Sequence, residues 1–165
     1  MMLNCKVFRT PCGDGCFVWG KEAVYRVFLS SPGVSAELKA GREFGSVDRV
    51  GSSFAGDVSE KLAALAIGAS VDVPLNILDF GSTSSFSRKV LLALMEVERG
   101  TTVSYGELAE KAGFPGAARA VGSVLASNPF PLVIPCHRVV RSDGSSGSYQ
   151  GGIVMKKYLL EAEVE

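Results

Sequence analysis

The N-terminal stretch of the chain alternates apolar and turn-forming segments in the manner of a small antiparallel sheet. Residues 3–9, 17–19 and 23–29 are rich in β-branched and aromatic side chains, which favour strands. The segments between them, 11–15 and 20–22, hold the glycine, proline and charged residues typical of tight turns. The pattern therefore predicts a three-stranded meander.

The segment that follows the meander is less regular. Glycines interrupt residues 31–54 repeatedly, so the pattern predicts no long element there. After it, Val58, Leu62 and Leu65 recur at helical spacing and predict one helix that packs on the sheet. Residues 72–80 are expected to be extended, with an interruption at Pro74.

Two further helices are predicted from apolar spacing in the second half. The first carries an apolar face over residues 86–97 and is closed by Gly100. The second covers residues 153–160 and ends among Glu161, Glu163 and Glu165. A carboxylate at a helix C-terminus opposes the helix dipole, so these residues are expected to have partners, and histidine is a natural one.

Between these helices the sequence predicts a pair of short ones. Ser104 and Glu107 have the spacing of a capping box, which predicts a helix from there to Ala112. A glycine-containing turn at 113–116 separates it from a second helix over 117–127. Two short helices joined by such a turn are typical of a helix-turn-helix. A helical hairpin without a DNA-binding role has the same pattern.

Together these elements predict an α+β fold in two domains. Residues 1–80 form a β-rich N-terminal domain, a small meander with one helix. Residues 81–165 form a mostly helical C-terminal domain that contains the helix-turn-helix and Cys136. The chain has 165 residues, 47% of them hydrophobic and 21% charged, as expected for an ordered globular protein.

Targeting signals are not evident in the sequence. The N-terminus lacks the charged head and apolar run of a secretory signal, and no segment approaches a transmembrane span. We therefore expect a cytoplasmic protein, or a nuclear one in a eukaryote, with no membrane partner.

Net charge is zero, but the charges are unevenly distributed. Residues 111–157 hold six cations and one acid, Asp143. Such an excess suits a polyanionic partner, and a solvated basic face is the alternative. The six cations are Lys111, Arg119, Arg138, Arg141, Lys156 and Lys157.

The cysteines do not make a metal site. His137 is the only histidine, and it lies far in sequence from Cys5, Cys12 and Cys16, so we expect no zinc. These three cysteines are interpreted as small buried residues of a hairpin. A disulfide between Cys12 and Cys16 remains open.

Cys136 and His137 are the main candidates for chemistry. A thiol with its ordinary pKa of about 8.5 is mostly protonated at neutral pH and needs a nearby base or positive charge to react. The apolar residues on both sides place the pair in the interior, where polar groups need partners. The alternative is that Cys136 is only a small buried hydrophobe.

The predicted second helix of the pair is almost bare of large side chains. Ala117 and Ala118 suit a close approach to a nucleic-acid backbone, and Arg119 alone reaches beyond them. Close packing between helices is the other use of such small residues, and Val121 and Gly122 suit it on another face.

Six ordered motifs in this half resemble those of the O6-alkylguanine-DNA alkyltransferases, also called methylated-DNA–protein-cysteine methyltransferases. The resemblance runs from about Val73 to Leu160, whereas the N-terminal half matches only in its β-rich plan. The motifs are FSRKVL (86–91), VSYGELA (103–109), AARAVG (117–122), NP (128–129), PCHRV (135–139) and YQGG (149–152).

The resemblance implies an irreversible transfer of an alkyl group to Cys136, with one turnover per molecule and no cofactor. His137, acting through a water, would take the thiol proton, and Glu163 would hold the imidazole. Tyr105 would give a proton to the departing guanine. Asn128 would tie the helix-turn-helix to the cysteine segment.

The resemblance also implies how DNA is held. The partner is a duplex carrying O6-alkylguanine, bound through the minor groove by a monomer. Arg119 would fill the gap left by the flipped base, with Ala117, Ala118 and Ser104 against the DNA. The base pocket would be lined by Pro131, Val139, Tyr149 and Gln150.

Gln150 departs from the pattern, because many members have serine at this position. A narrower pocket would restrict bulky alkyl groups more than methyl. Rival functions are a non-catalytic alkyltransferase-like DNA-damage binder, a thiol hydrolase and a redox-sensing regulator. The first of these lacks the acceptor cysteine that is present here, and the second leaves the helix-turn-helix unexplained.

Overall fold

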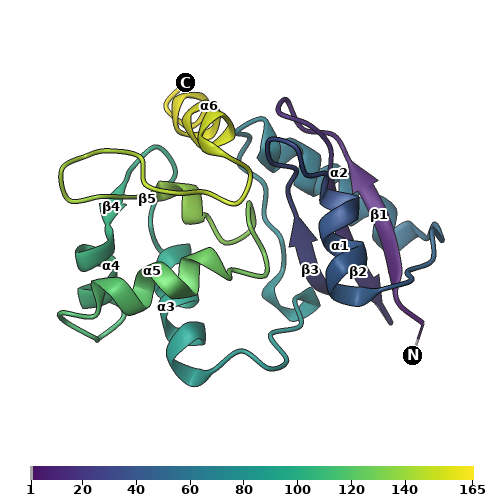
Figure 1. The fold of residues 1–165 in the computed structure, drawn as a ribbon, viewed down its shortest axis with the longest axis horizontal. Helices are drawn as coiled ribbons and strands as arrows, with labels where there is room; N and C mark the ends of the chain where they lie inside the picture. Colours follow the sequence, from purple (N-terminus) through teal and green to yellow (C-terminus); the bar gives the residue numbers. More distant parts are fainter. Residues whose placement is uncertain (1) are drawn as a thin grey trace.

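The computed structural model describes residues 2–165 and contains the expected meander (Figure 1). Strands β1 (Asn4–Phe8), β2 (Gly15–Gly20) and β3 (Ala23–Phe28) form one antiparallel sheet in the order β1-β2-β3. All six residues of β2 are buried. The central strand is therefore covered on both faces, which requires a layer on each side of the sheet.

Helix α1 (Ala36–Phe44) covers one face, and it was not predicted. Ser35 caps its N-terminus by accepting a hydrogen bond from the Leu38 amide. Its buried residues are only Ala36 and Ala40, so the apolar spacing is too weak to reveal a helix. Gly41, which suggested a break, lies within the helix and has no neighbour within 4 Å of where a Cβ would be.

Helix α2 (Ser53–Ala66) confirms the single helix predicted in this half. Its residues Val58 and Leu62 belong to the same buried cluster as Phe17 and Trp19 of β2, whereas Cys16 and Val18 cluster with α1. Alternate residues of β2 thus face opposite helices.

The segment 72–80 is not fully extended as predicted, because a short 3-10 turn, η1 (Leu75–Ile77), follows Pro74. Leu78 then pairs with Val24 of β3. This contact holds the connection against the sheet.

The second half is mostly helical, as expected. Its helices are α3 (Ser85–Met95), α4 (Tyr105–Lys111), α5 (Ala118–Ala126) and α6 (Ile153–Glu163). Helix α3 ends earlier than the Gly100 boundary predicted. Two short strands, β4 (Val103–Ser104) and β5 (Val139–Val140), pair in parallel and were also not predicted.

The capping box of α4 is confirmed. The Glu107 amide donates to Ser104 Oγ at 3.1 Å, and the Ser104 amide donates to Glu107 Oε2 at 2.7 Å. Gly113 and Gly116 adopt φ of 90° and 83° in the turn before α5, a backbone region that favours glycine. The helix pair α4–turn–α5 therefore forms as the sequence indicates.

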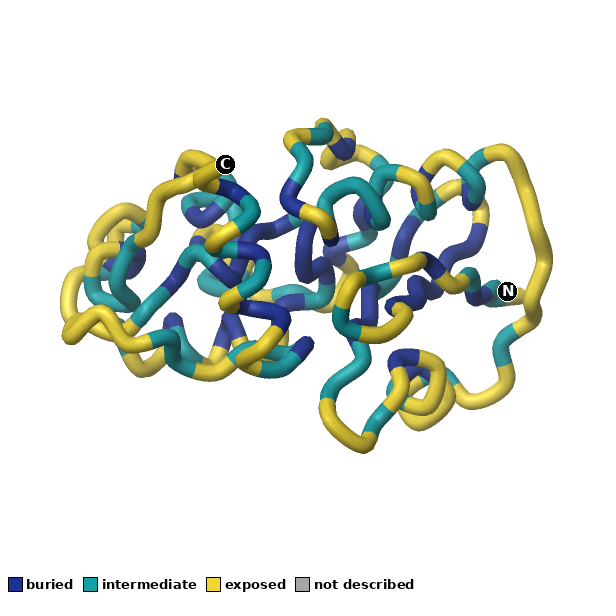
Figure 2. The backbone as a smooth tube through the Cα atoms, turned by 90° about the horizontal axis from the view of Figure 1, so that it is seen from above, coloured by how far each residue is buried: buried dark blue, intermediate teal, exposed yellow. Residues whose placement is uncertain are grey.

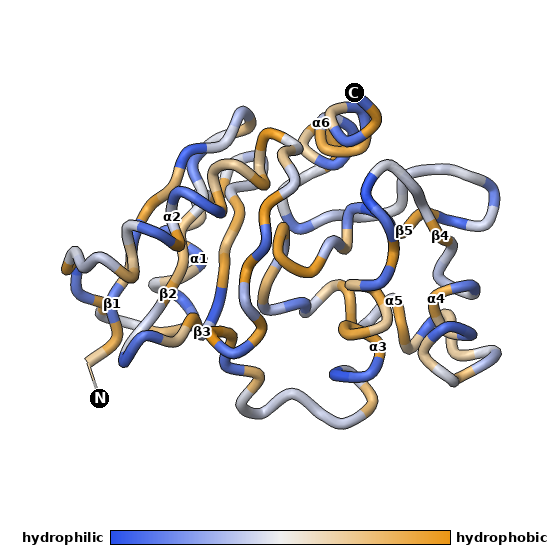
Figure 3. The backbone as a smooth tube through the Cα atoms, turned by 180° about the vertical axis from the view of Figure 1, so that it is seen from behind, coloured by the Kyte–Doolittle hydropathy of each residue, from blue (hydrophilic) through white to orange (hydrophobic). Residues whose placement is uncertain are grey.

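The two halves share one hydrophobic cluster, which crosses the predicted boundary at residue 80. Phe80 and Phe130 pack edge to face with ring centroids 5.2 Å apart, and the Val27 amide donates to the Pro129 carbonyl at 2.8 Å. Buried segments run between the halves, and exposed segments form the outer loops (Figure 2). Seen from behind, hydrophobic positions of the chain also gather where the two halves meet (Figure 3).

All four cysteines are free thiols. Cys5 and Cys16 are buried between β1, β2 and α1, whereas Cys12 is only half-buried. The open possibility of a Cys12–Cys16 disulfide is therefore not realised in this structure. None of the helices in residues 2–165 has the length and apolar character needed to cross a membrane.

Candidate active site

Cys136 follows a compact buried turn between α5 and β5. Pro131 bridges to Ile134, and Leu132 adopts a positive φ of 75°, which is uncommon for a residue other than glycine. The turn leads directly into the short 3-10 helix η2 (Cys136–Arg138). The nucleophile candidate is thus fixed by a tightly bent backbone.

Asn128 holds this turn from the end of α5. Its Nδ2 donates to the Ile134 carbonyl at 3.1 Å, and its Oδ1 accepts from the Phe130 amide at 3.0 Å. The side chain is completely buried and also forms a hydrogen bond with the Cys136 thiol. The helix-turn-helix and the cysteine segment are therefore joined through one amide.

The Cys136 thiol lies in an apolar environment. Burial raises its pKa, and the hydrogen bond from Asn128 and the positive charge of Lys156 oppose this rise only in part. The side chain is therefore a neutral thiol at pH 7. A base must remove the proton before the sulfur can act as a nucleophile.

His137 and Arg138, the two residues after Cys136, form a largely buried hydrogen-bonded cluster with Glu163 of α6. Glu163 Oε1 lies 2.7 Å from His137 Nε2 and 2.9 Å from Arg138 Nη2, while Arg138 Nε donates to Oε2 at 2.9 Å. Burial alone would raise the Glu163 pKa, but the bonds from His137 and Arg138 lower it to about 2. The carboxylate is therefore ionised and fixes the imidazole with Nε2 as the donor.

The other imidazole nitrogen is left available. His137 Nδ1 is buried and has no hydrogen-bond partner among the described residues. Tyr149 packs edge-on against this ring with centroids 6.3 Å apart, and its hydroxyl is likewise buried without a partner in residues 2–165. Buried polar groups of this kind usually have a purpose, and Nδ1 has the free lone pair that a base requires.

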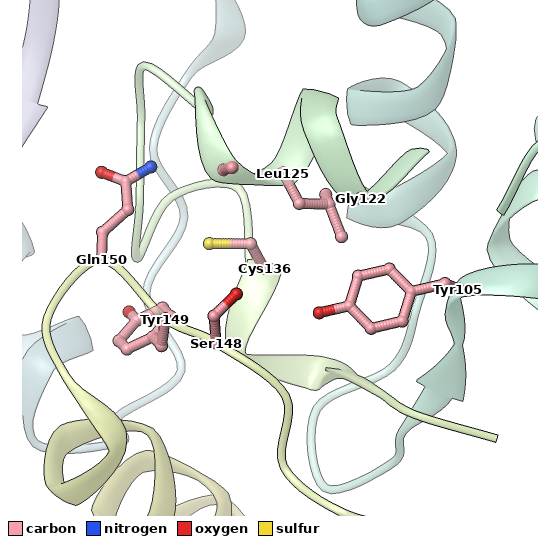
Figure 4. A pocket seen from close by; sticks show the side chains of 8 residues that line it. Tyr105, Gly122, Leu125, Cys136, Ser148, Tyr149 and Gln150 are labelled. Atoms are coloured by element: carbon pink, nitrogen blue, oxygen red, sulfur yellow. The ribbon is translucent and has the colours of Figure 1, made fainter. Parts of the chain in front are cut away.

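A cavity of about 210 Å³ opens above the thiol, between α5, Tyr105 and the loop before α6. Figure 4 shows Cys136 at its centre and the Tyr105 hydroxyl directed inward from α4. Tyr149 forms the wall beneath the thiol, and Gln150 lies at the far side. The lining residues are Tyr105, Gly122, Leu125, Ala126, Cys136, Ser148, Tyr149 and Gln150.

Comparison with known proteins agrees with this geometry. Residues 85–165 match the family described as 6-O-methylguanine DNA methyltransferase, DNA binding domain. The whole chain resembles the O6-methylguanine methyltransferase of Mycobacterium tuberculosis, with a TM-score of 0.79, 31% identity and coverage of 99% of this chain and 93% of that one. This chain belongs to the O6-methylguanine-DNA methyltransferase family. The resemblance suggested by the six motifs is confirmed.

Two further relatives define the extent of the match. The O6-methylguanine-DNA methyltransferase of Pyrococcus kodakaraensis has a TM-score of 0.72 and 31% identity, covering 98% of this chain and 99% of that one. The methylated-DNA–protein-cysteine methyltransferase of Methanothermobacter thermautotrophicus is 51% identical over 96 residues, which are 58% of this chain and 53% of that protein. The aligned part thus spans about half the length of that curated relative.

Lys156 lies close to the site and was not predicted to belong to it. It is completely buried on α6, and its Nζ donates to the Val139 carbonyl at 2.6 Å and the Ser148 carbonyl at 3.4 Å. Burial lowers its pKa, while the negative charge of a Cys136 thiolate raises it. A signal was present, because Lys156, Leu159 and Glu163 share one face of a helix at i, i+3 and i+7.

The expected pocket residues are not all in the cavity wall. Tyr149 and Gln150 line it, whereas Val139 and Pro131 do not. Val139 contributes instead through its carbonyl, which accepts from Lys156, and Pro131 belongs to the buried turn before Cys136. Ser148 and the α5 residues Gly122, Leu125 and Ala126 line the cavity and were not predicted.

The expected DNA-contacting residues lie together on the helix pair. Arg119 is exposed on α5, and Ala117 and Ala118 are partly exposed at its start. Ser104 is half-buried as the cap of α4. Gly122 and Tyr105 approach each other closely, with a Cβ on Gly122 falling 3.9 Å from the Tyr105 ring. The helix pair and the cavity are thus adjacent.

Two of the six cations in residues 111–157 do not face solvent. Arg138 is paired with Glu163, and Lys156 is buried. The others, Lys111, Arg119, Arg141 and Lys157, are exposed. Within residues 2–165 there is no group of three or more histidine, cysteine or acidic side chains arranged to hold a metal ion.

Proposed function

We propose that this protein repairs DNA by flipping O6-alkylguanine, chiefly O6-methylguanine, out of the duplex and transferring the alkyl group irreversibly to Cys136. The observation that carries the proposal is the cavity itself. It has the Cys136 thiol at its centre and residues of the helix-turn-helix in its wall, and the His137–Glu163 pair begins at the residue after Cys136. A base extruded from DNA needs such a pocket.

In the proposed reaction, His137 Nδ1 accepts the thiol proton through a bridging water. The thiolate sulfur then attacks the alkyl carbon, so that a C–S bond forms as the C–O bond to guanine breaks. The Tyr105 hydroxyl gives a proton to the departing guanine, and the imidazolium then restores that proton through water. The products are a Cys136 thioether and a repaired guanine, with atoms and charge in balance.

The proposed reaction occurs once per molecule and uses no cofactor. An alkyl thioether is a poor leaving group, and among the described residues Cys136 is the one thiol that lines the site. The protein is therefore consumed as a reagent.

The proposed partner is duplex DNA. The protein binds it as a monomer, through the minor groove. Small side chains at Ala117 and Ala118 permit α5 to approach the backbone closely, and Arg119 fills the gap in the stack after extrusion. A solved structure similar to this chain is that of a Mycobacterium tuberculosis relative in complex with DNA. Action on chromosomal DNA implies a cytoplasmic location, or a nuclear one in a eukaryote.

The direct test is a titration of increasing protein against a fixed amount of duplex bearing one O6-methylguanine. We expect lesion loss to rise linearly and to stop at one lesion per protein molecule. Continued turnover would contradict the single-use mechanism. Tight lesion binding without any lesion loss would instead identify a non-catalytic damage binder.

A Gln150→Ser variant is expected to accept bulky alkyl groups better. Gln150 lines the cavity, and its Nε2 donates to the Asn128 carbonyl at 2.9 Å, so its long side chain restricts the space. Relieving overpacking is worth roughly 1–3 kcal/mol, which corresponds to a gain of about 5- to 150-fold in the benzyl-to-methyl transfer ratio. Competition between O6-benzylguanine and O6-methylguanine measures it, and Gln150→Asn should be intermediate. An unchanged ratio would show that Gln150 does not limit the pocket.

Methylation of Cys136 is expected to destabilise the protein. Cys136 is 6% exposed, and a methyl group that overpacks its buried surroundings costs roughly 1–3 kcal/mol. For a chain of this size, this lowers Tm by roughly 2–10 °C. Thermal unfolding before and after reaction measures the shift, with Cys136→Ala plus the same DNA as control. Equal Tm values for fresh and spent protein would refute the expectation.

A further inference from the structure

Lys39 on α1 reaches from the N-terminal half to the wall of the active-site cavity. Its Nζ donates to the Leu29 carbonyl at 2.7 Å and to the Gln150 carbonyl at 3.2 Å. Leu29 follows β3, whereas Gln150 directly follows the pocket residue Tyr149. One ammonium group therefore joins two segments that are far apart in sequence.

Gln150 continues this connection toward the nucleophile. Its side-chain Nε2 donates to the Asn128 carbonyl at 2.9 Å. The Asn128 side chain in turn donates to the Ile134 carbonyl, which also accepts from the Cys136 amide at 2.8 Å. A series of hydrogen bonds thus runs from α1 through the cavity wall to the backbone of Cys136.

The cavity-wall segment, residues 149–152, also packs against the N-terminal half. A Cβ on Gly151 would lie 3.2 Å from Leu29 Cδ1, and one on Gly152 would lie 3.2 Å from Pro32 Cδ. The segment 149–152 therefore rests on the end of β3 through bare backbone. Lys39 links this segment to the N-terminal half, because its Nζ donates to both the Gln150 carbonyl and the Leu29 carbonyl.

We propose that Lys39 is a positioning residue for alkyl transfer, which acts by clamping the Gln150 carbonyl so that Tyr149 and the Asn128–Cys136 contact keep their reactive geometry. The proposal rests on the proposed function, and it assigns a role in that function to the N-terminal half. Without the ammonium group the Gln150 carbonyl loses a donor, and the wall segment gains freedom. Displacements of about 1 Å near a reacting centre cost roughly 10²-fold in rate.

The test compares Lys39→Met with a matched control, Lys61→Met. Lys61 lies on α2 of the same half and pairs with Asp57, so its loss removes the same charge without touching the cavity wall. Single-turnover methyl transfer is measured against the concentration of a duplex bearing one O6-methylguanine. This separates the transfer rate at saturation from the concentration that half-saturates the protein.

For Lys39→Met we expect a transfer rate at saturation about tenfold lower, with the half-saturating DNA concentration unchanged within about twofold. Lys39→Arg, which keeps the charge and the donors, should recover most of the rate. Lys61→Met should behave as the unmodified protein. If only the half-saturating DNA concentration changes, Lys39 is a DNA contact and the proposal fails. An unchanged transfer rate at saturation would also overturn the proposal.

Amide hydrogen exchange gives a second readout that does not need catalysis. In Lys39→Met, exchange should accelerate in residues 148–152 and remain unchanged in α2 and α3. If the unmodified protein transfers no methyl group, the proposed function fails, and exchange in 148–152 still tests the clamp. Unchanged exchange in that segment would overturn the clamp even where the unmodified protein is active.

Discussion

A Glu163→Gln variant is expected to transfer methyl groups roughly 10²- to 10⁴-fold more slowly than the unmodified protein. Glu163 receives hydrogen bonds from both His137 and Arg138, and its negative charge holds the imidazole with Nδ1 free to act as a base. A neutral amide does not enforce that tautomer, and the imidazolium formed during transfer loses its counter-charge. Single-turnover transfer at saturating DNA measures the effect.

Glu161→Gln is the matched control, because Glu161 lies on the same helix and is exposed. It should transfer at the normal rate. Loss of the Glu163 charge also leaves Arg138 without its partner, at a cost of about 3–5 kcal/mol in unfolding free energy. Rates are therefore compared well below the lower Tm. A Glu163→Gln protein that transfers at the normal rate would show that His137 needs no carboxylate.

The same carboxylate predicts a response to acid. Its pKa is about 2 in the folded protein against an ordinary value of 4.5, so ionised Glu163 stabilises the fold above pH 4.5. That contribution is lost as pH falls from 4.5 toward 2. Glu163→Gln should therefore lose less unfolding free energy over this range than Glu161→Gln does.

A Lys156→Met variant is expected to transfer methyl groups roughly 10- to 100-fold more slowly, with its rate rising at higher pH. The buried charge of Lys156 opposes the rise in the Cys136 pKa that burial causes, so its removal makes the thiolate harder to form. It also leaves the Val139 and Ser148 carbonyls without their donor, which costs about 1–3 kcal/mol in stability. The pH dependence of single-turnover transfer measures the first effect.

Lys157→Met is the matched control for this experiment, because Lys157 is the next residue and is exposed. Its transfer rate and pH profile should match those of the unmodified protein. The profile separates electrostatic activation from simple structural damage. A Lys156→Met protein that is slower at every pH by the same factor would contradict a role in thiolate formation.

Most of the fold follows from apolar spacing along the chain. The meander, α2 and the helix pair all carry strong patterns. The capping box identifies Ser104 as the residue that precedes the first turn of α4. Helix α1 was missed because it buries only alanines, Ala36 and Ala40. Strands β4 and β5 are two residues each, too short for any period to show.

The site was harder to predict, because its parts come from separate segments. Cys136 and His137 are neighbours in sequence, and the acidic end of α6 indicated that a carboxylate needed a partner. The family resemblance named Glu163 as the partner of His137, but spacing alone could not, because the contact depends on how α6 returns to η2. Lys156 and Lys39 donate hydrogen bonds to backbone carbonyls. Every residue has a carbonyl, so the sequence does not show which one a lysine will meet.

The most direct test of the account is intact-protein mass spectrometry after mixing with excess duplex that bears one O6-methylguanine, followed by peptide mapping. We expect a gain of one methyl group on Cys136, none on the free thiols Cys5, Cys12 and Cys16, and no gain in Cys136→Ala. An unchanged mass, or a methyl group on any other residue, would contradict it.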